Sequence, residues 1–147
     1  MAKRSKRLEL VKELAERRKK QADQMLAVSR NRVSQDEHGL QQLQAFLLDY
    51  QSEFIAAGQK TMDPRGVQTR QAFLNKITHT IMKHRESMQH NRQELDAVEM
   101  HWKKSYAGMK AMDVLHEKAL NQESLEQDKQ LQKELDERSQ LRKPDFF

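Results

Sequence analysis

The sequence predicts an all-α protein, a long antiparallel two-helix coiled-coil hairpin. Glycine and proline are scarce, with four and two residues among 147, and good helix formers fill the rest of the chain. Apolar residues recur at alternating spacings of three and four, which is typical of a coiled-coil seam. Convincing turn signals occur in one segment only, near Gly58. We therefore expect two helices within a single domain over residues 1–147.

The first helix is expected over about residues 3–57. Its apolar positions are Leu8, Val11, Ala15, Ala22, Leu26, Val33, Leu40, Leu43, Leu47, Tyr50 and Phe54, with polar residues at Arg18, Ser29 and Asp36. Leu26 follows Ala22 by four residues, where the alternation of spacings requires three. This spacing predicts a stutter, which relaxes the supercoil locally without ending the helix.

The turn is expected over about residues 58–66. Gly58 is suited to ending the first helix. Asp63 is a good N-cap for the second helix, and Pro64 follows it at a position where proline is tolerated. One turn between two seams means that the chain folds back once.

The second helix is expected over about residues 67–142. Its seam is Leu74, Ile77, Ile81, His84, Met88, Asn91, Leu95, Val98, Trp102, Ser105, Met109, Met112, His116 and Ala119, in unbroken alternation. The polar members of this seam can set the register of the two helices at some cost in stability. Beyond Ala119 the apolar positions shift to Leu120, Leu131 and Leu135 and thin out, so this stretch is expected to project past its partner.

Folding back at the turn places residues whose numbers sum to about 124 opposite each other. Leu47 then faces Ile77, and Ala22 faces Trp102. A small residue opposite a large one is what a close two-helix seam needs. The register therefore favours an antiparallel hairpin over a parallel dimer of the same helices.

Aromatic residues gather within a few helical turns of the bend, at Phe46, Tyr50, Phe54 and Phe73. Two helices share only one face, and Leu47, Tyr50 and Phe54 can fill it together with Ile77 and Ile81. Phe46, Leu48 and Phe73 lie off the seam and are expected to be partly exposed. This excess of apolar surface predicts a docking tip.

The composition argues against an enzyme and against a metal or cofactor site. Cysteine is absent and no HExxH motif occurs, and His79, His84 and His90 do not share a helical face. The sequence has no glycine-rich phosphate loop, nucleophile elbow or convergent carboxylate pair, and a two-helix hairpin lacks a cavity for a small-molecule substrate. Without a signal peptide or an apolar run that could span a bilayer, we expect a soluble protein, peripheral to a membrane at most.

The net charge of +5 arises in the first twenty residues, whose nine basic and three acidic side chains give +6, while the rest of the chain is close to neutral. A basic coiled coil that binds nucleic acid is one alternative, although Glu13–Arg17 and Glu16–Lys20 are i, i+4 pairs typical of a solvated face. Lys3, Arg4, Lys6 and Arg7 lie where the helix dipole disfavours positive charge, so this end should fray unless an acidic partner holds it. We expect an anionic surface to bind the paired ends, Leu8–Lys20 and Tyr106–Leu120, through the cluster Arg17, Arg18, Lys19 and Lys20.

Five segments resemble the FliJ family, the small coiled-coil component of the bacterial flagellar type III export apparatus. They are "LVKELAE", "LLDYQSEF", "QAFLNKITHTIMKHR", "HWKKSYAGMKAMDVLHEKA" and "LRKP", and the resemblance covers nearly the whole chain. It implies a hairpin like the rotor stalk of rotary ATPases, with no catalytic activity of its own. The implied partners are the export ATPase FliI, the export-gate protein FlhA and empty export chaperones, at the cytoplasmic face of the inner membrane. The ATPase is then the acidic partner expected to contact the paired ends through Arg17, Arg18, Lys19 and Lys20.

The resemblance also implies the residues that would contact the gate. The family's tip patch falls on Leu47, Tyr50, Phe54, Phe73, Ile77, Thr80 and His84. Leu47, Ile77 and His84 are seam positions as well, so either the two seams are offset by a residue or the patch uses partly buried side chains. The implied role is protein export for flagellum biogenesis, and hence motility and chemotaxis; the related stalk of a virulence type III secretion system is the nearest alternative.

Overall fold

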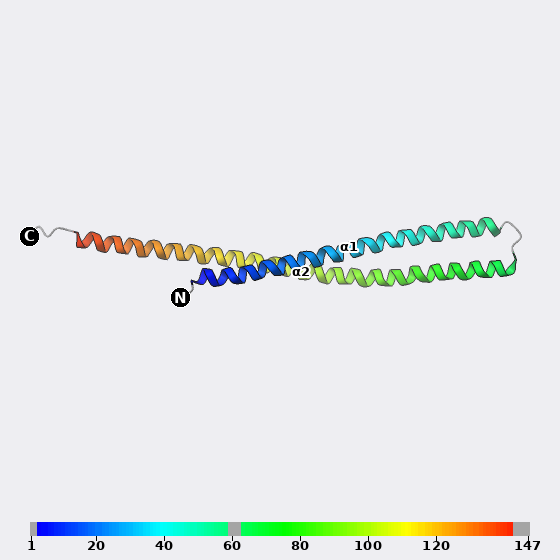
Figure 1. Ribbon diagram of the computed structural model, residues 1–147, viewed down its shortest axis with the longest axis horizontal. Helices are drawn as coiled ribbons and strands as arrows, with labels where there is room; N and C mark the ends of the chain where they lie inside the picture. Colours follow the sequence, from blue (N-terminus) through cyan, green and yellow to red (C-terminus); the bar gives the residue numbers. More distant parts are fainter. Residues whose placement is uncertain (1–2, 59–62, 143–147) are drawn as a thin grey trace, which may run out of the picture. The chain divides into compact units, whose positions relative to one another are not determined.

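The computed structural model describes residues 3–58 and 63–142. It contains α1, Arg4–Gly58, and α2, Pro64–Leu141 (Figure 1), and no strand in these ranges. The prediction of an all-α two-helix hairpin is confirmed. Residues 59–62 of the expected turn lie outside the described residues. On its far side, Asp63 caps α2 as predicted, because its Oδ1 accepts a hydrogen bond from the Arg65 backbone N–H at 3.4 Å.

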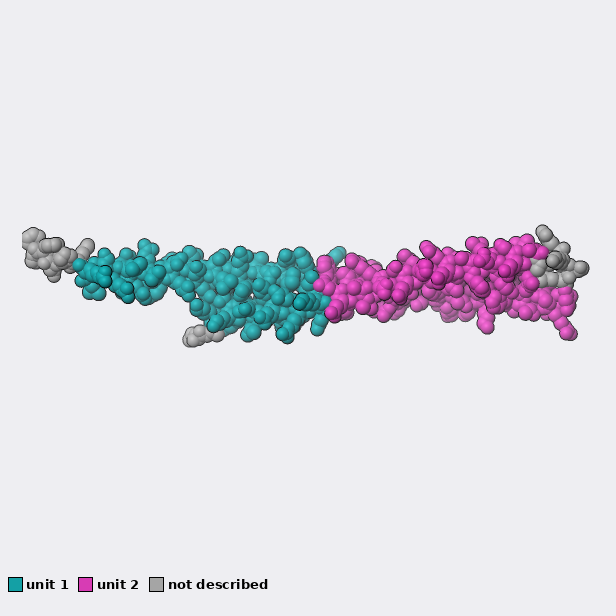
Figure 2. All heavy atoms as spheres, turned by 45° about the horizontal axis from the view of Figure 1, so that its top comes forward, with its two compact units in different colours: residues 1–21, 103–147 teal, residues 22–102 magenta. Residues whose placement is uncertain are grey.

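The chain divides into two compact units, each containing a segment of both helices (Figure 2). Unit 1 is Met1–Gln21 with Lys103–Phe147, and unit 2 is Ala22–Trp102. The expectation of a single domain stays a prediction.

The two helices are antiparallel in each unit. In unit 2, Trp102 Nε1 donates to Asp23 Oδ1 at 2.6 Å, and Arg32 Nη1 lies 3.3 Å from Glu94 Oε2. In unit 1, Lys12 Nζ lies 3.8 Å from Asp113 Oδ1. The residue numbers in these pairs sum to about 125, close to the predicted register of a hairpin with a short connection.

The predicted seam of α2 is the core-facing stripe of that helix. Every residue of it from Leu74 to Ala119 is buried or half-buried, and Ile77, Ile81 and Met88 are among the most buried. Opposite them, α1 buries Ala22 and Leu26. Two helices enclose little volume, and no large side chain among the described residues is fully buried. The stability of the hairpin therefore rests on a single thin seam.

The predicted stutter in α1 is wrong. Lys12 and Lys19 are half-buried, whereas Val11 is 46% exposed and Arg18 is exposed. With the two lysines in the seam, the spacing alternates three and four without interruption from Ser5 to Phe54. A lysine can occupy such a position because its aliphatic stem packs against the partner helix while its ammonium group reaches the edge.

A polar layer interrupts the apolar seam of unit 2. Asn91 Nδ2 donates to Asp36 Oδ2 at 2.7 Å, and His84 Nε2 lies 2.8 Å from the Asp36 backbone carbonyl oxygen. A slip of one turn would break both contacts and leave partly buried polar atoms without partners. The layer therefore favours a single register, as expected for polar seam residues.

The last part of α2 extends beyond the start of α1 (Figure 1). Ser5 of α1 is hydrogen-bonded to Glu123, and every residue from 124 to 142 is exposed. Leu120, Leu131 and Leu135 are exposed as well. The predicted projection past the partner helix is thus confirmed.

Candidate interaction surfaces

Three aromatic rings form a cluster in unit 2. The centroid of the Phe73 ring lies 6.3 Å from that of Phe46, edge to face, and 4.7 Å from that of Tyr50. Phe46 is 50% exposed and Phe73 is 39% exposed, so the seam does not cover them. The predicted exposure of Phe46, Leu48 and Phe73 is confirmed.

A shallow groove runs beside this cluster. Its lining is almost entirely apolar, with one cation at the rim: Leu43, Phe46, Phe73, Lys76, Ile77 and Thr80. Such a groove can take an apolar side chain of a partner, with an acidic neighbour near Lys76. Three of these residues, Phe73, Ile77 and Thr80, belong to the patch expected from sequence.

Five of the seven patch residues lie deeper than a docking surface requires. Ile77 is only 6% exposed. Leu47, Tyr50 and Phe54 are half-buried seam residues, and the ring of His84 turns toward the Asp36 carbonyl. These five residues are thus wholly or partly buried, which fits the second of the two arrangements expected above, and the patch itself stays a prediction.

Leu43, Phe46 and Lys76 were not among the expected patch residues. A sequence signal existed for Phe46, because Phe46 and Phe73 each precede a seam residue, Leu47 and Leu74, by one position. In an antiparallel pair such positions adjoin along one edge, and the contact between the two rings shows this directly.

The basic cluster of α1 is divided between two environments. Arg17, Arg18 and Lys20 are exposed, whereas Lys19 is half-buried in the seam. We number heptads so that position a is Ser5, Lys12 and Lys19 in α1, and Met109, His116 and Glu123 in α2. Arg17 and Arg18 then occupy positions f and g, away from the acidic residues of this part of α1, which occupy positions b and e.

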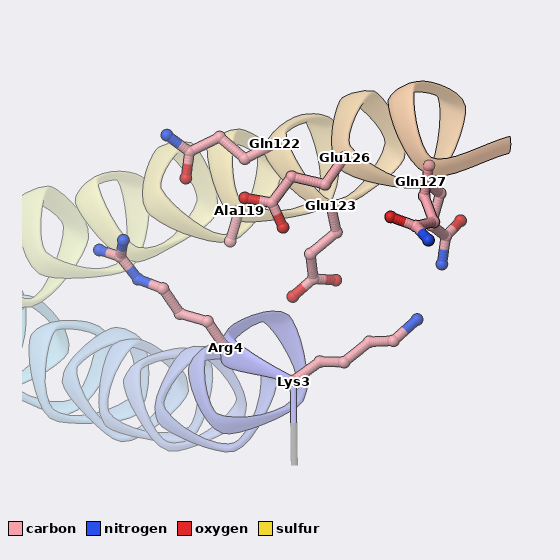
Figure 3. A pocket seen from close by; sticks show the side chains of 8 residues that line it. Lys3, Arg4, Ala119, Gln122, Glu123, Glu126 and Gln127 are labelled. Atoms are coloured by element: carbon pink, nitrogen blue, oxygen red, sulfur yellow. The ribbon is translucent and has the colours of Figure 1, made fainter. Parts of the chain in front are cut away.

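Charge is segregated around unit 1. We define the basic face as heptad positions c, f and g of residues 3–21 and 103–123. It carries seven cations and no acidic residue. The cations are Lys3, Arg4, Arg7, Arg17, Arg18, Lys104 and Lys118. The acidic residues of the same ranges occupy positions a, b and e. Arg4 and Gln122, both at position g, line one groove (Figure 3), so the g edges of the two helices adjoin.

The basic face also carries exposed apolar side chains. They are Leu10, Val11 and Leu14 of α1 with Val114 and Leu115 of α2. A surface that combines concentrated positive charge with exposed aliphatic groups fits an acidic, amphipathic partner.

The start of α1 is held by α2. Glu123 Oε2 accepts a hydrogen bond from Ser5 Oγ at 2.6 Å, and Glu123 Oε1 accepts one from the Ser5 backbone N–H at 3.0 Å. The carboxylate satisfies a backbone donor that the first turn of a helix leaves unpaired and places negative charge at the positive end of the dipole. The acidic partner expected for this end is thus a residue of the same chain.

These contacts set the charge state of Glu123. The hydrogen bonds from the Ser5 side chain and then from its backbone lower the pKa of Glu123 below 4.5; burial opposes this effect, and the nearby Lys3 and His116 add to it. Because the pKa is lower in the folded state, the stabilisation is present above pH 4.5. It is lost as the pH falls through the lowered pKa.

Acid should therefore release the first turn of α1 selectively. We expect the Ser5 amide resonance to titrate with a midpoint below pH 4.5 and its protection from hydrogen exchange to fall several-fold across that transition. Glu123→Gln should abolish this titration, because the amide carries no charge to lose. Glu126→Gln, which changes a neighbouring carboxylate in the same groove, serves as the control and should leave it intact. A Ser5 amide that titrates identically in all three proteins would contradict the cap.

Neither a metal-binding group nor a membrane-spanning segment occurs among the described residues. Within them no group of three or more His, Cys, Asp or Glu side chains is placed to hold a metal ion. The described parts of both helices also lack a segment long and apolar enough to cross a membrane. The features that stand out are instead the apolar groove of unit 2 and the basic face of unit 1.

The fold defines a two-helix coiled-coil protein. Comparison with protein-family models gives a match to "Flagellar FliJ protein" over residues 4–143. The chain therefore belongs to the FliJ family and is a flagellar export-related protein of a non-catalytic family. Searches among curated proteins and among solved structures found no match.

Proposed function

We propose that this chain is a stalk that links the export ATPase FliI to the export-gate protein FlhA and assists in handling export chaperones. The observation that supports this role is the presence of two surfaces of different chemistry, one in each unit. The groove of unit 2 offers exposed rings to one partner, and the basic face of unit 1 offers cations to another. A linker between two different proteins needs two such surfaces.

We assign the groove of unit 2 to the gate. Phe73, Ile77 and Thr80 line it, and the family's tip patch falls on the same residues. Tyr50 supports this surface from the seam, because its ring packs against Phe73. Through this contact the protein would be cytoplasmic and peripheral to the inner membrane.

We assign the basic face of unit 1 to the ATPase. Arg17 and Arg18 are exposed on the basic face of unit 1, which carries no acidic residue, so an acidic surface of the ATPase can approach without repulsion. Lys19 is less suited to this role because it occupies the seam.

Charge reversal on the basic face should weaken binding to FliI. For Arg17→Glu with Arg18→Glu we expect the dissociation constant to rise at least about tenfold at low salt, because attraction becomes repulsion at the contact. The matched control is Lys103→Glu with Lys110→Glu, which changes the net charge equally at exposed b positions and should change affinity much less. Equal losses from the two pairs, measured by calorimetry with purified FliI, would argue against a specific contact on this face.

A further inference from the structure

The basic face of unit 1 consists of three bands along the two helices. The band near the start of α1 carries Lys3, Arg4, Arg7 and Lys118. The band farthest from that start carries Arg17, Arg18 and Lys104. The band between them is aliphatic throughout, with Leu10, Val11, Leu14, Ala111, Val114 and Leu115. Along the helix the two cationic bands are separated by about 15 Å, from Arg7 to Arg17.

The aliphatic band continues from one helix to the other. Val11 and Leu115 both occupy position g, and their residue numbers sum to 126. Arg4 and Gln122 have the same position and the same sum, and they line one groove. Residues related in this way adjoin along one edge of an antiparallel pair. Val11 therefore lies beside Leu115, and the three bands belong to one surface.

The hairpin itself does not cover the aliphatic band. Leu10 is 68% exposed, Val11 46% and Leu115 41%. Between residues 3 and 21, the exposed large apolar residues of α1 are Leu10, Val11 and Leu14, and all three lie on the basic face. The opposite positions b and e carry the acidic residues Glu9, Glu13, Glu16, Asp113 and Glu117. Unit 1 is thus amphipathic around its axis as well as polarised in charge.

We propose that the basic face of unit 1 docks directly on an anionic lipid bilayer. The aliphatic band enters the boundary between headgroups and acyl chains, as the apolar side of an interfacial helix does. The cations on both sides of it reach the lipid phosphates, because the long stems of arginine and lysine let their charges stay at headgroup level. The acidic positions b and e allow only this face to approach the membrane without repulsion.

A bilayer fits the order of the bands better than a nucleic acid does. A nucleic acid presents phosphates along its whole length, so it would hold the uncharged middle band against a charged backbone. A bilayer is continuous and has apolar material beneath every headgroup. Both cationic bands and the aliphatic band between them therefore find their partners at the same time.

The lipid contact goes beyond the stalk role. The face carries no aromatic residue, and a few aliphatic side chains insert only shallowly, so the binding is reversible. Lipid and the proposed ATPase contact both cover Arg17 and Arg18 and therefore exclude each other. The free chain is held at the membrane until the ATPase takes over this face. The test needs only the purified chain and lipid, so its failure leaves the stalk proposal untouched.

Co-sedimentation of the full chain with vesicles measures the contact. We expect binding to vesicles that contain about one third phosphatidylglycerol in phosphatidylcholine, and no binding to pure phosphatidylcholine. Binding should weaken strongly between about 0.05 M and about 0.5 M salt, because salt screens the attraction of the cations to the headgroups. Soluble polyglutamate, which offers the charge without the acyl chains, should bind much more weakly than the vesicles.

Charge reversal within the face tests its cations. Arg7→Glu with Lys118→Glu should lower the vesicle partition coefficient at least about tenfold. Lys103→Glu with Lys110→Glu changes the net charge equally at exposed b positions outside the face and should lower it much less.

Removal of the aliphatic band tests insertion while the charge stays constant. Val11→Ser with Leu115→Ser should lower the partition coefficient about tenfold. Leu120→Ser with Leu131→Ser removes two leucines that are at least as exposed, at positions e and b, and should change it by less than about twofold. Circular dichroism should show unchanged helicity for all these variants.

A fluorescent label reports the depth of the face directly. The chain has no cysteine, so Leu14→Cys creates a unique attachment site for an environment-sensitive fluorophore. On anionic vesicles its emission should shift to shorter wavelength and be quenched by lipids with brominated acyl chains. The same label at Leu120→Cys, an exposed leucine outside the face, should remain in water.

Three results would overturn the proposal. The first is a chain that does not bind the anionic vesicles at low salt. The second is binding that the aliphatic variant retains in full while the label at residue 14 stays in water, which would mean attraction of charges alone. The third is equal binding to polyglutamate and to vesicles, which would assign the face to an acidic protein.

Discussion

Phe73→Ala is expected to weaken binding to FlhA by about 30-fold, the equivalent of about 2 kcal/mol for a central aromatic anchor. The ring is 39% exposed and contacts both Phe46 and Tyr50. Its removal therefore takes away a side chain that a partner can bury and loosens the neighbouring ring. Calorimetric titration of the gate's cytoplasmic domain measures this effect, and loss of swimming motility should accompany it.

The matched control is Leu48→Ala. Leu48 is also exposed in the same part of α1, but it is not among the residues that line the groove beside Phe73. This change should leave gate binding, helicity and ATPase association near those of the unaltered protein. If Phe73→Ala instead unfolded the hairpin, or if both substitutions weakened gate binding equally, the groove would not be the docking site.

Ile81→Ala is expected to lower the free energy of unfolding by about 2 to 4 kcal/mol. Ile81 is among the few apolar side chains that the seam buries, and two helices provide no second layer that could collapse into the space left behind. Native proteins are stable by only about 5 to 15 kcal/mol, so this loss is large. Urea unfolding followed by circular dichroism measures it.

The adjacent residue supplies the control for this prediction. Met82 is exposed on the same turn of α2, and Met82→Ala should change stability by no more than about 0.5 kcal/mol. Similar losses for both substitutions would show that helix propensity, and not burial in the seam, determines the stability of this region.

The two helices and their register could be predicted from the sequence. Apolar spacing alone identified every seam residue of α2 from Leu74 to Ala119, because the apolar residues of a coiled coil recur with the period of its seam. The antiparallel register followed from the single turn. Asp63 and Pro64 marked the start of α2 for the same reason, since helix capping depends on residues adjacent in sequence.

The places where prediction failed involve polar residues in the seam. Val11 and Arg18 were assigned to the seam where the structure has Lys12 and Lys19, and this produced a stutter that the helix does not have. Hydrophobicity assigns a whole residue to one environment, whereas a lysine stem can be buried while its charge stays at the edge. The first seam was therefore traced through the wrong positions in its first twenty residues.

By itself, the sequence determined the helices, the turn, the seam of α2 and the surplus of aromatic residues near the bend, because these depend on local spacing and propensity. Only the tertiary structure decided which side chains meet across the two helices. It placed Glu123 against Ser5 and brought Phe46 to Phe73 and Asp36 to Asn91. It also placed seven cations of residues 3–21 and 103–123 on one face without acidic residues. Each of these contacts depends on how one helix is rotated about its axis relative to the other. A small change in this rotation keeps the apolar residues in the seam but gives the residues at its edges different partners.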